Sequence, residues 1–171
     1  MQLTFLFISF LFLFILFILF EIIQLVRRNY NRTKGYEKAF NMSKKTKKQL
    51  LVIGSPETGG YNSIFGNNYG CGNVCIDIVG CGKCKNQEQV DALDYLKKQP
   101  TNYYVIYESC VLEAIDDETK NKKIIDEIKR VSGGDYVNVR VGTSIINYIY
   151  FPKIWENGKT NIIKKTVIKT Y

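Results

Sequence analysis

The sequence contains no histidine among its 171 residues. This absence excludes Ser–His and Cys–His nucleophilic catalysis and removes imidazole as a metal ligand. It also removes the side chain that most often transfers protons near neutral pH. Enzyme classes that depend on a catalytic histidine are therefore excluded.

Residues Leu3 to Phe20 lack charged side chains, and their only polar members are Thr4 and Ser9. Because about 20 apolar residues in a helix cross the core of a bilayer, this stretch predicts a transmembrane anchor over residues 1–26. A cleaved signal peptide is the alternative, but no Lys or Arg precedes the apolar run and no small-residue cleavage site follows it. A core helix of a soluble protein would need a polar face, which this stretch lacks.

Basic residues follow the apolar stretch directly, and the whole chain has 24 Lys and Arg against 16 Asp and Glu. Residues 27–48 are therefore expected to form a basic juxtamembrane linker, and the positive-inside rule predicts a cytosolic C-terminal domain. The lipid bilayer is the expected partner. Anionic headgroups could bind the basic residues, although topology and solvation explain the same charges. Nucleic acid is not an expected partner, because the charges form a run without interleaved aromatic residues. The run consists of Arg27, Arg28, Arg32, Lys34, Lys38, Lys44, Lys45, Lys47 and Lys48.

Residues 49–171 alternate between strand and helix patterns. Helical spacing predicts helices over Glu88–Gln99 and Asp116–Val131, the first followed by Pro100 and the second by Gly133–Gly134. Strands separated by helices imply βαβ units and a largely parallel sheet. The predicted fold is therefore an α/β, Rossmann-like domain preceded by one transmembrane helix. The expected strands are Leu50–Ile53, Asn73–Ile78, Tyr103–Tyr107, Tyr136–Val141, Ile145–Phe151 and Asn161–Lys169.

The first expected strand ends at Gly54 in a turn rich in Gly, Ser and Pro, and Asp77 lies near the end of the second strand. A strand, a glycine loop and an acidic residue in this order form the skeleton of a nucleotide-binding crevice. The glycines admit the ligand, and the carboxylate accepts hydrogen bonds from ribose hydroxyls. A tight connection between strand and helix also explains the turn, and Asp77 has the alternative role of a strand-end or loop-capping acid.

The order of these pieces resembles the class I methyltransferase fold, which binds S-adenosylmethionine. Leu51–Gly60 stands where that family has a strand and a Gly-x-Gly-x-Gly loop. Val105–Asp117 is similar to the fourth strand and the Leu-Glu start of the next helix. Asp126–Gly134 looks like the helix and Gly-Gly turn before the fifth strand. The whole chain is also similar to uncharacterised, membrane-anchored methyltransferase-like proteins of large DNA viruses.

The resemblance implies S-adenosylmethionine as the cofactor and transfer of its methyl group to an acceptor, a protein or a small molecule, that the sequence does not identify. Asp77 would hold the ribose, Asp91 would lie near the adenine, and the loop would face the methionine end. The implied cofactor-binding residues are Gly54, Ser55, Gly59, Gly60, Asp77, Asp91 and Ser109.

Glu108 is the candidate catalytic residue, because a carboxylate at the crevice could polarise or deprotonate the acceptor. A surface acid that starts a helix is its alternative role. The loop itself departs from the family pattern, since Pro56 lacks an N–H group and Glu57 adds negative charge. The alternative function is therefore a catalytically inactive relative that serves as a structural or interaction component, for example in a virion.

Four of the five cysteines lie close together in the sequence. Their number suits a tetrahedral zinc site, although only the last two have the usual Cys-x-x-Cys spacing. In a cytosolic domain the thiols are expected to be reduced, unless the chain sits in an oxidising compartment or virion. Redox chemistry at the Cys-x-x-Cys pair and simple packing in the core are the other interpretations. The four are Cys71, Cys75, Cys81 and Cys84; the fifth, Cys110, lacks a histidine to activate it and is expected to pack or to line the cofactor.

Overall fold

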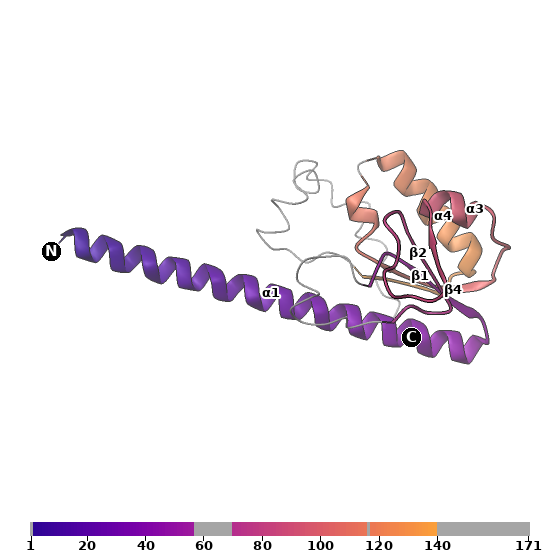
Figure 1. Ribbon diagram of the computed structural model, residues 1–171, viewed down its shortest axis with the longest axis horizontal. Helices are drawn as coiled ribbons and strands as arrows, with labels where there is room; N and C mark the ends of the chain where they lie inside the picture. The colour runs from indigo at the N-terminus through magenta and orange to yellow at the C-terminus, as the bar shows by residue number, and fades with distance from the viewer. Residues whose placement is uncertain (1, 57–69, 116, 140–171) are drawn as a thin grey trace.

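The computed structural model describes residues 2–56, 70–115 and 117–139 (Figure 1). The strands expected at 145–151 and 161–169 lie outside these residues. The described elements, in chain order, are α1 (Gln2–Thr46), β1 (Gln49–Ile53), β2 (Val74–Asp77), β3 (Gln87–Gln89), α3 (Ala92–Lys97), β4 (Tyr104–Ser109), the 3-10 helix η1 (Leu112–Ala114), α4 (Glu118–Ser132) and β5 (Tyr136–Val139).

The described strands form one parallel sheet in the order β3-β2-β1-β4-β5. β1 lies in the middle, where it pairs with β2 on one side and β4 on the other. Its apolar run, Leu50 to Ile53, is buried throughout, as expected for a strand covered on both faces. The prediction of an α/β domain with a parallel sheet after an apolar N-terminal helix is therefore confirmed.

The expected helix over Glu88–Gln99 is only partly present. Residues Gln87–Gln89 form the edge strand β3, paired with β2, and the helix begins after Asp91. Asp91 accepts a hydrogen bond from the backbone N–H of Leu93, which makes it the N-cap of α3. The sequence pattern alone could not distinguish strand from helix at Gln87–Gln89, because these residues are held extended by their pairing with β2.

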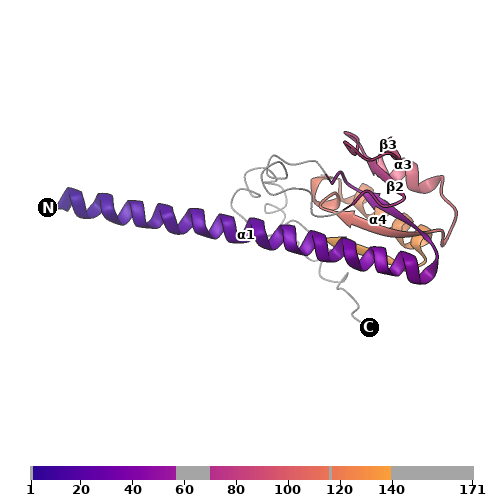
Figure 2. The same cartoon turned by 60° about the horizontal axis from the view of Figure 1, so that its bottom comes forward.

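Helices cover both faces of the sheet (Figures 1 and 2). The face formed by Leu51, Ile53 and Ile106 packs against α3 and α4, whereas the opposite face packs against the second half of α1. On that second face Ala39 of α1 is fully buried beside Tyr107 of β4. The domain therefore has a three-layer core, and one of its layers is the helix that also carries the apolar segment.

Residues 27–46, expected as a polar linker, continue α1 without a break. The ring of Tyr36 meets that of Tyr107 edge-on, with centroids 5.6 Å apart. Gly35 lies so close to Val139 and Tyr107 that a Cβ atom would overlap the Val139 side chain. The residues on this face, Gly35, Tyr36, Ala39 and Met42, recur at helical spacing, but the surrounding lysines masked that pattern.

Candidate functional site

The strands β1, β2, β4 and β5 end at one edge of the sheet, because all of them run in the same direction. In open α/β sheets ligands bind outside the carboxyl ends of the strands. The residues at this carboxyl edge are therefore the ones to compare with the predicted site: Gly54, Ser55, Asp77, Glu108, Ser109 and Cys110.

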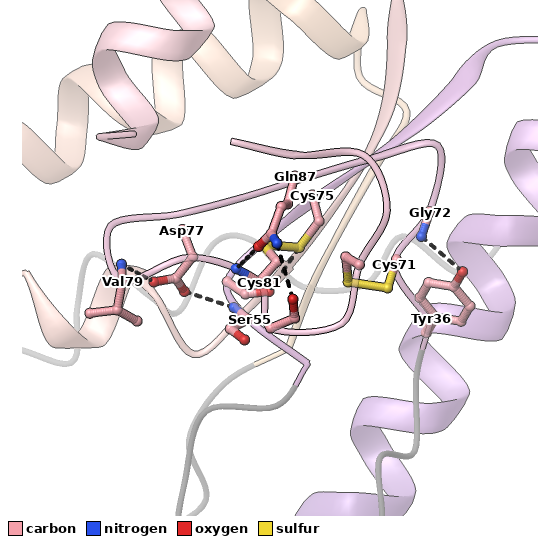
Figure 3. Close-up of a disulfide and its surroundings, with 12 residues drawn as sticks. Tyr36, Ser55, Cys71, Gly72, Cys75, Asp77, Val79, Cys81 and Gln87 are labelled. Atoms are coloured by element: carbon pink, nitrogen blue, oxygen red, sulfur yellow. Dashed lines mark hydrogen bonds between the residues drawn. A yellow bond between two sulfur atoms is a disulfide. The ribbon is translucent and has the colours of Figure 1, made fainter. Parts of the chain in front are cut away.

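Asp77 lies beside the Gly54 turn, as the sequence predicted. One carboxylate oxygen (Oδ2) accepts a hydrogen bond from the backbone N–H of Ser55 at 2.7 Å, and the other (Oδ1) accepts one from Val79 at 2.9 Å (Figure 3). Ser55 is buried, so this bond satisfies an N–H group that water does not reach. Asp77 thus fastens the turn after β1 to the turn after β2, which is the loop-capping role.

Gly54 is required by the packing of the chain itself. Its φ is 99°, in the region that favours glycine, and its N–H donates to the carbonyl of Ile76 at 2.9 Å. A Cβ atom here would lie 2.7 Å from Cγ2 of Val111 and 2.9 Å from the carbonyl oxygen of Ser109. The end of β4 and the residues after it therefore occupy the space next to this glycine. Gly59 and Gly60 lie outside the described residues.

Asp91, predicted near an adenine, is used within the fold. Besides capping α3, its Oδ2 pairs with Nζ of Lys120 in α4 at 2.7 Å. Partial burial acts to raise the pKa of Asp91, but the hydrogen bonds from Lys120 and from the backbone of Leu93 outweigh it and lower the pKa below its ordinary value. The carboxylate is therefore ionised at neutral pH and holds α3 against α4.

Glu108 and Ser109 are buried at the end of β4 rather than exposed in a crevice. One carboxylate oxygen of Glu108 accepts hydrogen bonds from the backbone N–H groups of Val111 at 2.6 Å and Leu112 at 3.2 Å. The hydroxyl of Ser109 accepts a hydrogen bond from Nε of Arg32 at 3.1 Å. Glu108 is therefore not the surface acid of its alternative role: it lies within β4 and is buried, and it accepts hydrogen bonds from N–H groups where η1 begins.

Cys110, expected to pack or to line the cofactor, lies in the backbone turn after β4. Its φ is 61°, and its N–H donates to the carbonyl of Val139 at 2.9 Å. This backbone bond ties the end of β4 to the end of β5, and the thiol donates to the same carbonyl at 3.7 Å.

Four cysteines form two nested disulfides, Cys71–Cys84 and Cys75–Cys81. The expectation of reduced thiols is therefore wrong for this structure. The sulfur atoms are bonded to each other, so they are not the four thiolates that a zinc ion would need. An even number of closely spaced cysteines is compatible with disulfides, but the spacing does not show which cysteines pair.

The disulfides attach the segment between β2 and β3 to the core. Cys75 and Cys81 are fully buried in the cluster that faces α1. Oε1 of Gln87 accepts a hydrogen bond from the N–H of Cys81 at 2.7 Å (Figure 3). The hydroxyl of Tyr36 on α1 accepts one from the N–H of Gly72 at 3.3 Å, next to the outer disulfide. This short, edge-strand segment has few apolar residues, so covalent bonds replace part of the hydrophobic contribution.

The contact of Arg32 with the carboxyl edge was not predicted from the sequence. Arg32 was counted among the charges near the membrane, yet its side chain is buried against Ser109 and its carbonyl accepts a hydrogen bond from the hydroxyl of Tyr107 at 3.0 Å. Arg32 lies three residues before Gly35, on the face of α1 that packs against the sheet, and this spacing could have indicated that its side chain is buried.

Comparisons with protein-family models, with curated proteins and with solved structures gave no match.

Proposed function

We propose that this chain is a membrane-anchored protein whose Rossmann-like domain has a structural or interaction role and no catalytic one. The observation that carries the proposal is the engagement of Asp77. Both of its carboxylate oxygens accept backbone hydrogen bonds from the chain, from Ser55 and from Val79. The acid that would hold a ribose instead holds two loops together.

The membrane anchor is the first half of α1. Among the helices in the described part of the chain, α1 is the one that is long and apolar enough to cross a bilayer. The large apolar side chains of its first half, such as Phe12, Leu13 and Phe14, are exposed and make no core contact. Exposed side chains of this size along about five turns of helix are stabilised by lipid and not by water.

The described residues do not fit S-adenosylmethionine as a ligand. Gly54 has no space beside it, and the polar atoms of Asp91 and Ser109 bond to Lys120 and Arg32. Cofactor binding remains the second candidate function because of one specific observation. The strand order β3-β2-β1-β4-β5 brings Asp77 to the turn after β1, which is the placement that the resemblance to methyltransferases implies.

Titration calorimetry of the full chain in detergent with S-adenosylmethionine separates the two candidates. The full chain is needed because α1 forms one layer of the core. We expect no heat of binding at micromolar cofactor, and the same result for Asp77→Asn. Micromolar binding that Asp77→Asn abolishes, while the exposed-residue control Asp94→Asn preserves it, would favour the enzyme.

The proposal also concerns the side of the membrane on which the C-terminal domain lies. The basic residues after the anchor favour the cytosolic side, whereas the two disulfides favour oxidising surroundings. A domain inserted on the cytosolic side and oxidised after it leaves the cytosol, as in a virion membrane, satisfies both. Each disulfide would form by exchange with an oxidised protein disulfide, which takes up the two electrons and two protons.

Protease protection tests this topology. All five cysteines follow residue 70, so cysteine labelled with sulfur-35 reports on the domain alone. After synthesis with sealed microsomes, we expect external protease to digest the labelled domain, and we expect all five thiols to react with a maleimide. A protected domain with four unreactive cysteines would instead place it on the luminal side.

A further inference from the structure

The strands run back along α1, toward the end of the helix that carries the apolar segment (Figure 1). Only Lys47 and Lys48 separate α1 from β1, and Lys47 has a φ of 57° that reverses the chain. At the start of β1, the hydroxyl of Ser43 donates to the carbonyl of Lys48 at 2.7 Å. At the far end of β4, Ser109 meets Arg32. The carboxyl edge is therefore level with Arg32.

This level lies close to the bilayer. The apolar stretch reaches Val26, six residues before Arg32, and a helix rises about 1.5 Å per residue, so the separation along the axis is about 9 Å. The headgroup layer beyond the hydrocarbon is roughly 5–7 Å thick. Arg27, which is exposed, falls in that layer, where a cation meets lipid phosphates. The carboxyl edge, level with Arg32, consequently lies about 2–4 Å beyond the headgroup layer, a distance that a side chain can span.

Two exposed aliphatic side chains stand on this edge. Ile78 and Val79 follow the end of β2 directly, and their exposed fractions are 68% and 67%. Among the described residues after α1, the one other large exposed hydrophobic is Tyr103, at 44%, next to the opposite end of β4. Within residues 70–115 and 117–139, the large exposed aliphatic side chains thus lie on the side that faces the apolar half of α1.

We propose that the carboxyl edge is a membrane-docking surface, in which Ile78 and Val79 insert into the interface of the bilayer that α1 spans. The inference rests on the proposed membrane anchorage and extends it, because the ligand of this edge would be a phospholipid at the membrane surface and not a soluble nucleotide. Two aliphatic side chains add only a small free energy of insertion, but the anchor already holds them next to the lipid, so a small contribution suffices.

Quenching by brominated lipids tests the proposal. The chain has a single tryptophan, Trp155, so Trp155→Phe provides a background without tryptophan. In this background Val79→Trp is compared with Tyr103→Trp, a matched exposed position at the opposite edge. The full-length variants are reconstituted into phosphatidylcholine vesicles that contain phosphatidylcholine brominated high on its acyl chains. We expect about threefold stronger quenching at position 79 than at position 103, because interfacial side chains reach about 5–10 Å into the boundary.

The two proposals fail in different ways. If the variants do not float with the vesicles after alkaline carbonate treatment, the anchor itself is wrong. If they float but both tryptophans are quenched equally weakly and are equally accessible to aqueous iodide, the edge does not dock. Ile78→Trp repeats the measurement at the neighbouring position, so that a folding defect of one variant does not decide the result.

Discussion

Replacing Cys71 and Cys84 together by serine is expected to lower the free energy of unfolding of the domain by about 3 kcal/mol. A disulfide stabilises mainly by restricting the unfolded chain, and a closed loop of about 15 residues contributes this amount. For a domain of this size the melting temperature should fall by roughly 10 °C or more. Thermal unfolding of the full chain in detergent, followed by circular dichroism, measures the change.

Three comparisons make this prediction specific. Dithiothreitol should lower the melting temperature of the natural chain, and should have a smaller effect on the double variant, which retains only the Cys75–Cys81 bond. Cys110→Ser is the matched control, since Cys110 lies outside both disulfides. A natural chain whose unfolding is unchanged by dithiothreitol would contradict the structural role of these bonds.

Asp77→Ala is expected to destabilise the domain by about 2–4 kcal/mol. The substitution removes the carboxylate that accepts hydrogen bonds from two backbone N–H groups, and leaving a buried donor unsatisfied costs about 1–3 kcal/mol. The larger part of the loss belongs to Ser55, because it is buried, whereas water can replace Asp77 at the exposed Val79. Denaturant titration of the full chain measures the difference.

Asp77→Asn should be intermediate, because an amide retains one oxygen acceptor. Asp94→Ala, at an exposed position in the first turn of α3, should change the free energy of unfolding by no more than about 0.5 kcal/mol. An Asp77→Ala protein as stable as the natural one would mean that the carboxylate does not hold the loops. Asp77 would then be available for a ligand, and the cofactor-binding candidate would gain support.

Several features followed from local sequence because local forces decide them. The uncharged run from Leu3 to Phe20 predicted a long apolar helix, and it forms the first half of α1. The apolar run of β1 and the spacing in α4 report burial directly, since strands and helices repeat with different periods. The position of Asp77 beside the Gly54 turn also followed, because the ends of neighbouring parallel strands meet at one edge.

The roles of the site residues did not follow, because they depend on partners far away in the chain. Asp91 pairs with Lys120, and Ser109 with Arg32, across 29 and 77 residues. No local pattern distinguishes a carboxylate that waits for a ribose from one that holds two backbone N–H groups. The sequence predicted that Asp77, Asp91 and Ser109 belong to one site, and only their contacts in the structure show what each of them binds.

The sequence alone thus determined the apolar N-terminal helix, the α/β class and the edge at which Asp77 lies, since each depends on short-range hydrophobic patterns. The tertiary structure decided that α1 runs on into the core, which cysteines are joined, and that the carboxyl edge faces the apolar half of α1. The course of α1 and the direction of the carboxyl edge depend on the packing of Tyr36 and Ala39 against the sheet and on the chain reversal at Lys47. Both are long-range consequences of filling one face of the sheet, and a local pattern does not carry that information.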